Sequence, residues 1–174
     1  MYGENKLDSL PDGEETCDAT AVASFERSPR LAEIKAVYRS RTKAAERPPM
    51  RDAKDVEAYL RAVWNRRTLE LTEDFIVICL NGSHRAVGWV KVSSGGFNSS
   101  VVDPRLVFAI ALQTASTAIV LAHNHPSGNL DPSSQDKAMT RHLREAGKLL
   151  GIAVLDHLIL TKESSFSFAE NGLM

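Results

Sequence analysis

The sequence has few of the features that mark secreted, membrane-spanning or nucleic-acid-binding proteins. Its only cysteines are Cys17 and Cys79, which are too few for a disulfide framework or a cysteine-based zinc site. No apolar stretch is long enough to span a bilayer, and the polar start of the chain lacks the apolar segment of a signal peptide. The formal net charge of -1 gives no overall attraction to nucleic acid or to membranes. These absences predict a cytoplasmic protein, with Cys79 as a buried thiol in an apolar run.

Length and composition predict one folded domain with an appendage. With 43% hydrophobic and 25% charged residues among 174, the chain can bury a core without cross-links. Residues 1–24 are acidic and carry few large apolar side chains, so we predict a flexible arm there. Residues 25–51 are expected to hold a strand (31–38) and a basic connector ending in two prolines, and residues 52–174 the main domain.

The main domain alternates between helical and extended patterns. Apolar spacing predicts helices over residues 52–67, from Asp103 onward, and over 133–150, where Gly151 ends the last one. Apolar runs predict strands over residues 75–80, 86–92, 117–122, 153–160 and 165–169. The last two helices are expected to bury Leu106, Val107, Ile110, Ala111, Ala138, Met139, Leu143, Ala146, Leu149 and Leu150. This order favours an α/β fold in which helices sandwich a mixed sheet.

A candidate metal site follows the strand over residues 117–122. His123 and His125 alternate at the strand exit, so both side chains are expected on one face of the sheet. Asp136 lies in the first turn of the next helix and completes the site if that helix folds back over the strand. Two imidazoles and a carboxylate are three of the four ligands of a catalytic zinc, and the fourth position is left for water. We therefore predict one zinc ion per chain and a hydrolytic reaction.

A hydrolase of this kind also needs a base that takes a proton from water and passes it to the leaving amine. The best candidate is Glu73, which stands just before the strand over residues 75–80; Glu70 and Asp74 compete with it. From position alone, Glu73 can equally be a solvated acid in a loop. Asp136 can likewise be a favourable charge at a helix start, and Ser133 a plain helix cap.

The string His-Asn-His-Pro-Ser-Gly over residues 123–128, followed by Pro-Ser-x-x-Asp over 132–136, resembles the RadC family. That family is a bacterial branch of the JAB/MPN metalloprotease domains, which carry the JAMM motif. The similarity extends over residues 51–174 and more loosely over 33–38. Further matches lie at residues 73–75, 80–81, 94–96, 103–105, 156–159 and 167–172.

The resemblance implies a sheet sandwiched by helices, as in the cytidine-deaminase-like JAB/MPN architecture. It implies zinc held by His123, His125 and Asp136, with Glu73 as the base and Ser133 as stabiliser of the oxyanion. In related enzymes the bond cleaved is a peptide or isopeptide bond, so a peptide or protein substrate is expected. Longer RadC proteins carry a helix-hairpin-helix module, and residues 1–49 show no matching Gly-rich helical hairpin.

Two other functions compete with a zinc peptidase. The resemblance to RadC proteins, which often carry a DNA-repair label, implies a DNA-repair-associated or nucleic-acid-associated protein as the alternative. The basic residues between Arg27 and Arg51 give this some support, although no groove-reading motif accompanies them and a solvated surface explains them better. A binding module that keeps the fold without the chemistry is disfavoured, because the whole set of candidate site residues is present. His157 follows Asp156 in an apolar strand and is interpreted as a supporting residue rather than a metal ligand. The sequence does not predict the oligomeric state.

Overall fold

The computed structural model describes residues 38, 42–95 and 102–174 of the chain. The predicted acidic arm (1–24), the predicted strand over 31–38 except Tyr38, and the first three residues of the predicted basic connector (39–41) lie outside these residues. In the part that is described, no helix is both long enough and apolar enough to cross a bilayer.

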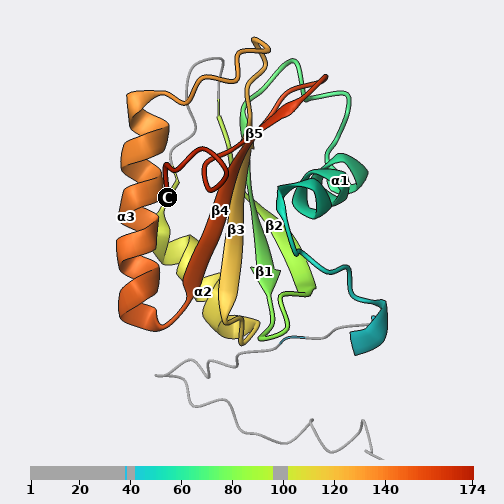
Figure 1. The fold of residues 1–174 in the computed structure, drawn as a ribbon, viewed down its shortest axis with the longest axis vertical. Helices are drawn as coiled ribbons and strands as arrows, with labels where there is room; N and C mark the ends of the chain where they lie inside the picture. Colours follow the sequence, from blue (N-terminus) through green and yellow to red (C-terminus); the bar gives the residue numbers. More distant parts are fainter. Residues whose placement is uncertain (1–37, 39–41, 96–101) are drawn as a thin grey trace, which may run out of the picture. The chain divides into compact units, whose positions relative to one another are not determined.

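Five strands form one mixed sheet in the order β2-β1-β3-β4-β5 (Figure 1). β1 runs antiparallel to both β2 and β3, β3 runs parallel to β4, and β5 returns antiparallel along the end of β4. The apolar runs of the sequence became the three central strands, because these are buried over all or most of their length. The bounds are β1 Asp74–Leu80, β2 Ala86–Ser94, β3 Ala118–Asn124, β4 Ala153–Leu160 and β5 Ser165–Ser167.

Helices cover both faces of this sheet, α1 on one side and α2 with α3 on the other (Figure 1). Successive side chains of β1 point to opposite faces, so Ile76 and Ile78 join the core under α1, while Phe75 and Val77 join the core under α2 and α3. The predicted α/β fold with a mixed sheet between helices is therefore confirmed. The bounds are η1 Ala44–Glu46 (a short 3₁₀ helix), α1 Ala53–Val63, α2 Pro104–Gln113 and α3 Ser134–Leu150.

The helix predicted over residues 52–67 ends earlier, at Val63. Asn65 accepts hydrogen bonds there, its side chain from the Arg67 backbone N–H and its carbonyl from the Thr68 backbone N–H. Asparagine competes in this way with helical hydrogen bonding, so the chain leaves the helix in a turn. The start was predicted correctly, because the Asp52 carboxylate caps the helix by accepting from the Asp55 backbone N–H.

Some apolar residues predicted to be buried are exposed. Leu106 in α2 and Leu149 and Leu150 at the end of α3 keep 45%, 89% and 46% of their surface exposed. The buried stripe of α3 comprises Asp136, Thr140, Leu143 and Gly147. This stripe begins with polar residues and ends at a glycine, so apolar periodicity alone misplaced it.

Candidate metal centre

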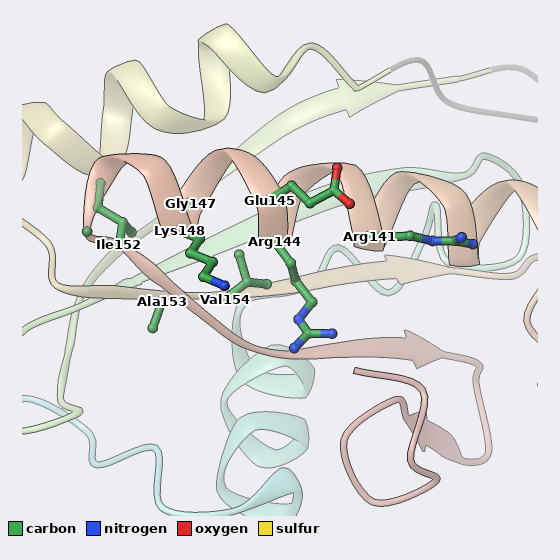
Figure 2. A pocket seen from close by; sticks show the side chains of 9 residues that line it. Arg141, Arg144, Glu145, Gly147, Lys148, Ile152, Ala153 and Val154 are labelled. Atoms are coloured by element: carbon green, nitrogen blue, oxygen red, sulfur yellow. The ribbon is translucent and has the colours of Figure 1, made fainter.

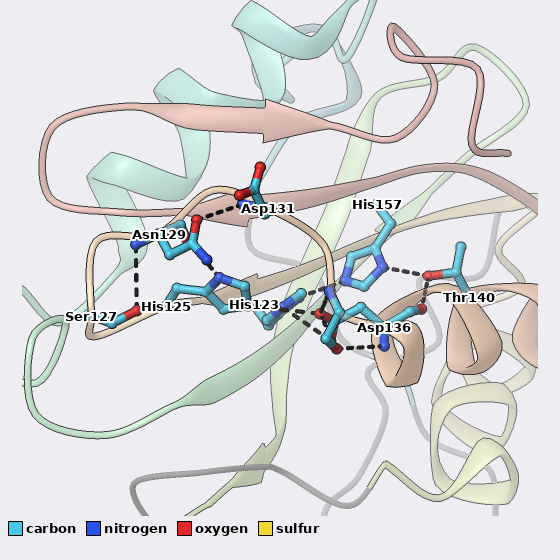
Figure 3. A network of polar contacts seen from close by, with 9 residues as sticks. His123, His125, Ser127, Asn129, Asp131, Asp136, Thr140 and His157 are labelled. Carbon is cyan, nitrogen blue, oxygen red and sulfur yellow. Dashed lines mark hydrogen bonds and ion pairs between the residues drawn. The ribbon is translucent and has the colours of Figure 1, made fainter.

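His123, His125 and Asp136 come together where β3 ends and α3 begins (Figure 3). His123 is still part of β3, which runs two residues further than predicted because the pairing of β3 with β4 continues to Asn124. One ligand atom from each of the three residues lies within 4.8 Å of the others, as a shared metal ion requires. The structure thus brings together the three side chains that the sequence predicted as ligands.

A chain of buried hydrogen bonds determines which nitrogen of His123 carries its proton. The Thr140 hydroxyl donates to the Asp136 carbonyl oxygen at 2.6 Å, so it can only accept from His157 Nδ1, also at 2.6 Å. His157 Nε2 then has no proton and accepts from His123 Nδ1 at 2.8 Å. The Nε2 atom of His123 is therefore left with a free lone pair, as a metal ligand needs.

His125 is oriented in the same way by a carbonyl group. Its Nδ1 lies 2.6 Å from the backbone oxygen of Asn129, which can only accept, so Nδ1 carries the proton and Nε2 does not. The two unprotonated Nε2 atoms of His123 and His125 face each other at 2.9 Å. Two lone pairs and a carboxylate converging at this distance repel one another unless a cation lies among them. The donor set therefore fits a divalent metal ion.

Burial favours the neutral form of the His123 and His157 imidazoles. Burial disfavours the charged ring and is the main reason that the pKa of His123 falls to about 4. The Asp136 carboxylate raises this pKa and the neighbouring His125 lowers it, but both effects are smaller than that of burial. Burial also lowers the pKa of His157 well below its ordinary value, and its neighbours His123 and His125 add to this effect. Neutral rings at pH 7 are the state in which histidine binds metals.

The Asp136 carboxylate is held by the start of its own helix. Its Oδ2 accepts from the backbone N–H of Ser133 at 2.8 Å and from the Ser133 hydroxyl at 2.6 Å, while Oδ1 lies 3.3 Å from His123 Nε2. This reciprocal arrangement is a capping box. Ser133 is thus the helix cap that the sequence also allowed. By holding Oδ2, which lies 3.8 Å from His125 Nε2, it orients the carboxylate so that Oδ1 faces His123.

Among the three candidate bases, Glu73 is the one that strand alternation, continued one residue before β1, predicts on the face of His123. The antiparallel register pairs Phe75 with His123, so these two share a face, and Glu73 lies two residues before Phe75. Asp74 points to the opposite face, where its carboxylate accepts from the Ser94 hydroxyl at 2.5 Å. Glu70 forms an ion pair with Lys162 at 2.8 Å.

Asn124 ties the segment before β1 to the end of β3. Its side-chain oxygen accepts from the Asp74 backbone N–H at 2.7 Å, and its side-chain nitrogen donates to the carbonyls of Leu69 at 2.7 Å and Thr72 at 2.9 Å. These three bonds hold the backbone on both sides of Glu73. Sequence analysis missed the roles of Asn124 and Thr140. The only available signals were that Asn124 is a polar residue between two predicted ligands and that Thr140 is a polar residue one helical turn after a third.

The buried imidazoles predict a pH dependence of stability for the protein stripped of metal with a chelator. Because the pKa values of His123 and His157 are lower in the folded chain than in the unfolded one, the unfolded chain binds more protons below about pH 6.5. The free energy of unfolding should therefore decrease from pH 6.5 to 5, by up to about 1.4 kcal/mol per pH unit for each ring. Urea unfolding at several pH values measures this, and His157→Gln should remove about half of the slope. A free energy that stays constant over this range would contradict the prediction.

Comparison with known families agrees with this geometry. The sequence profile described as "RadC-like JAB domain" matches residues 50–173, which include the three metal-site side chains and Glu73. The chain belongs to the RadC-like JAB domain family. The resemblance read from the motifs is thereby confirmed.

Curated relatives share the family and carry the name UPF0758 protein, which states no reaction or substrate. The relative from Trichlorobacter lovleyi is 47% identical over 102 residues, which cover 59% of this chain and 44% of the relative. The relative from Flavobacterium johnsoniae is 42% identical over 101 residues, covering 58% and 44%. The matched part of this RadC-like chain thus spans less than half the length of these relatives.

Proposed function

We propose that this RadC-like protein is a zinc-dependent hydrolase that cleaves a peptide or isopeptide bond. The observation that carries the proposal is the close approach, 2.9 Å, of the Nε2 atoms of His123 and His125 beside the Asp136 carboxylate. Nitrogen and carboxylate ligands of this kind, three in number, are typical of catalytic zinc. Membership of the JAB family supports the same class of reaction.

Zinc held by His123, His125 and Asp136 would supply the Lewis acidity that makes water a nucleophile near neutral pH. Glu73 accepts the proton of that water and passes it to the leaving amine, so the carboxylate is restored when the C–N bond has broken. Asn124 keeps the backbone on either side of Glu73 in place during this transfer. Phe75 stacks on His123, with ring centroids 6.2 Å apart, and excludes water from that side of the ring.

Ser133 is assigned the stabilisation of the oxyanion that forms on the scissile carbonyl. Its hydroxyl donates to Asp136 Oδ2 in this structure, so the assignment requires it to rotate away from that oxygen. The Ser133 backbone N–H also donates to Oδ2 and can retain this part of the helix cap. A hydroxyl that moves between two acceptors is compatible with both roles.

Metal content and hydrolysis test the proposal together. The purified full chain should contain about one zinc per molecule, and it should hydrolyse members of a panel of fluorogenic peptides and of peptides with lysine isopeptide bonds. Stripping with a chelator should abolish cleavage, and added zinc should restore it. A chain that binds no zinc under any of these conditions, or binds it without cleaving any member of the panel, would contradict the proposal.

The Thr140 hydroxyl is expected to influence zinc affinity without touching the metal. In Thr140→Val, His157 Nδ1 loses its acceptor, so the tautomers of His157 and His123 are no longer fixed. Zinc should then bind about 10- to 100-fold more weakly, as for other outer-shell partners. Competition with a chromophoric chelator measures this affinity, and Thr140→Ser, which retains the hydroxyl, is the matched control. Equal affinity of Thr140→Val and the unmodified protein would show that the hydrogen-bonded chain does not orient His123.

We assign this activity to the cytoplasm, since Cys79 is a buried free thiol and the described residues contain no disulfide. The alternative of a nucleic-acid-associated protein depends on basic residues that lie largely outside the described part of the chain. A filter-binding titration with duplex DNA at low salt distinguishes the two functions, because the hydrolase proposal requires no binding of DNA.

A further inference from the structure

We propose that the start of β4 is a docking edge for an extended acidic segment of a partner protein. The docking edge is Ala153–Leu155, at the opposite end of the sheet from the metal centre. β3 runs parallel to β4, and the metal ligands lie at the carboxyl end of β3. The proposal does not depend on the hydrolytic activity.

Within residues 42–95 and 102–174, the docking edge has a neighbouring strand on one side only. β3 pairs with Ala153 and Val154, whereas β5 pairs only with the last residues of β4, from Leu158 to Leu160. Among the described residues, the segment after β5 donates to the His157 carbonyl from the Phe168 backbone N–H and to the Asp156 carboxylate from the Ala169 backbone N–H. Within this part of the chain it forms no backbone hydrogen bond with Ala153–Leu155. An edge left open in this way presents backbone groups to which another strand can pair.

A basic groove of about 540 Å³ borders the docking edge on the α3 side (Figure 2). Arg144 and Lys148 extend from α3 toward Ala153 and Val154, and Arg141 lies one turn further along the helix. Glu145 also lines the groove, but its carboxylate turns to the other side of the helix in this view. Within the described residues, none of the three cations forms an ion pair, so their charge is available to a ligand.

A second cavity, of about 410 Å³, borders the docking edge on the α1 side. Its apolar part is formed by Leu155 with the buried residues Met50, Val56 and Val120, and polar or charged residues complete the lining: Arg51, Asp52, His84, Asp156 and Glu170. A strand added to the edge points its side chains alternately to the two faces of the sheet. Acidic side chains would then meet the basic groove, and the apolar side chains between them would enter the second cavity.

Charge decides between this occupant and others. A second copy of the chain that paired through the same edge would bring two sets of Arg144 and Lys148 together, which like-charge repulsion disfavours. Nucleic acid would meet the cations but could use neither the backbone edge nor the apolar part of the second cavity. An acidic peptide segment with apolar residues at alternate positions uses all three features.

The probe is a fluorescein-labelled peptide of the sequence Gly-Ser-Glu-Val-Asp-Leu-Glu-Gly-Ser, titrated with the full-length protein and followed by fluorescence anisotropy. The peptide should bind, and a peptide with the same residues rearranged so that the acids are consecutive should bind at least about tenfold more weakly. The double variant Arg144→Glu/Lys148→Glu should weaken binding by at least about tenfold. Arg66→Glu/Arg67→Glu, an equal change of charge at the other end of the sheet, should change it less than about twofold.

Amide hydrogen exchange on the unmodified protein tests the backbone pairing. The Ala153 N–H donates toward β3, to the Thr117 carbonyl, so the Val154 N–H points to the open edge. Bound peptide should slow exchange at Val154. Binding without such slowing, binding unaffected by Arg144→Glu/Lys148→Glu, or no binding would each overturn the proposal. Val154 already protected in the peptide-free protein would do so too, because a segment of the protein itself or a second copy would then occupy the edge.

Discussion

Zinc affinity is expected to fall by more than about 100-fold when Asp136 is replaced by asparagine, because the loss of a direct ligand should exceed the effect of an outer-shell residue. The amide of Asp136→Asn retains an oxygen that can accept from the Ser133 N–H and hydroxyl, so the start of α3 should remain folded. It lacks the negative charge that balances the metal. Inductively coupled plasma mass spectrometry of the purified variant measures its zinc, and circular dichroism measures its helix content.

Ser133→Ala is the matched control for this experiment. It removes the capping hydroxyl but leaves the Asp136 carboxylate, so it should cost about 1 kcal/mol of stability and retain zinc. The pair of variants separates the two roles of Asp136, as ligand and as part of the helix cap. Zinc retained in Asp136→Asn at the affinity of the unmodified protein would exclude Asp136 as a ligand.

Hydrolysis should fall by about 100- to 10,000-fold in Glu73→Gln while zinc content stays at one per chain. The amide has the size of the carboxylate but cannot accept a proton from water. The pH profile of kcat should lose the limb that reports protonation of this carboxylate. Single-turnover cleavage of the best substrate from the peptide panel, with zinc measured on the same sample, tests both parts of the prediction.

Two neighbouring acids serve as controls for Glu73. Glu70→Gln breaks only the exposed ion pair with Lys162 and should leave kcat unchanged. Asp74→Asn alters a buried carboxylate on the opposite face of the sheet, so it should affect stability more than the chemical step. If Glu70→Gln or Asp74→Asn abolished cleavage while Glu73→Gln retained it, the base would have been assigned to the wrong acid.

The cluster of His123, His125 and Asp136 was predictable from sequence because each member depends on local geometry. His123 and His125 need only the alternation of an extended chain, and Asp136 needs only a helix start shortly after them. Their supports were not predictable in this way. The contact between His123 and His157 depends on the parallel pairing of β3 with β4, and the contact of Thr140 with His157 depends on how α3 packs on that pair.

The order of the sheet was also beyond the sequence pattern. Apolar runs showed that β1, β3 and β4 are buried, but only the structure shows that β1 lies next to β3. The prediction that Glu73 lies on the face of His123 depends on that neighbourhood, because it follows from the pairing of Phe75 with His123. Likewise, the exposed Leu149 follows from the end of the buried stripe at Gly147, where an added Cβ would lie 2.4 Å from the Ile152 carbonyl oxygen. Apolar periodicity predicts which face of a helix is buried, but not how far along the helix the burial extends.

The hydrogen bonds of Asn124 have a mechanical consequence for the proposed hydrolase. In β3, His123 points to the proposed metal site. The next residue, Asn124, points to the other side of the sheet and holds the segment that carries Glu73 by hydrogen bonds. Base and ligands are thus fastened to the same short piece of backbone, and a thermal displacement of that piece carries both with it. The distance from Glu73 to the proposed metal should therefore stay constant as the surrounding loops move. Different substrates should then differ in their access to the site, and not in the arrangement of base and ligands that they meet there.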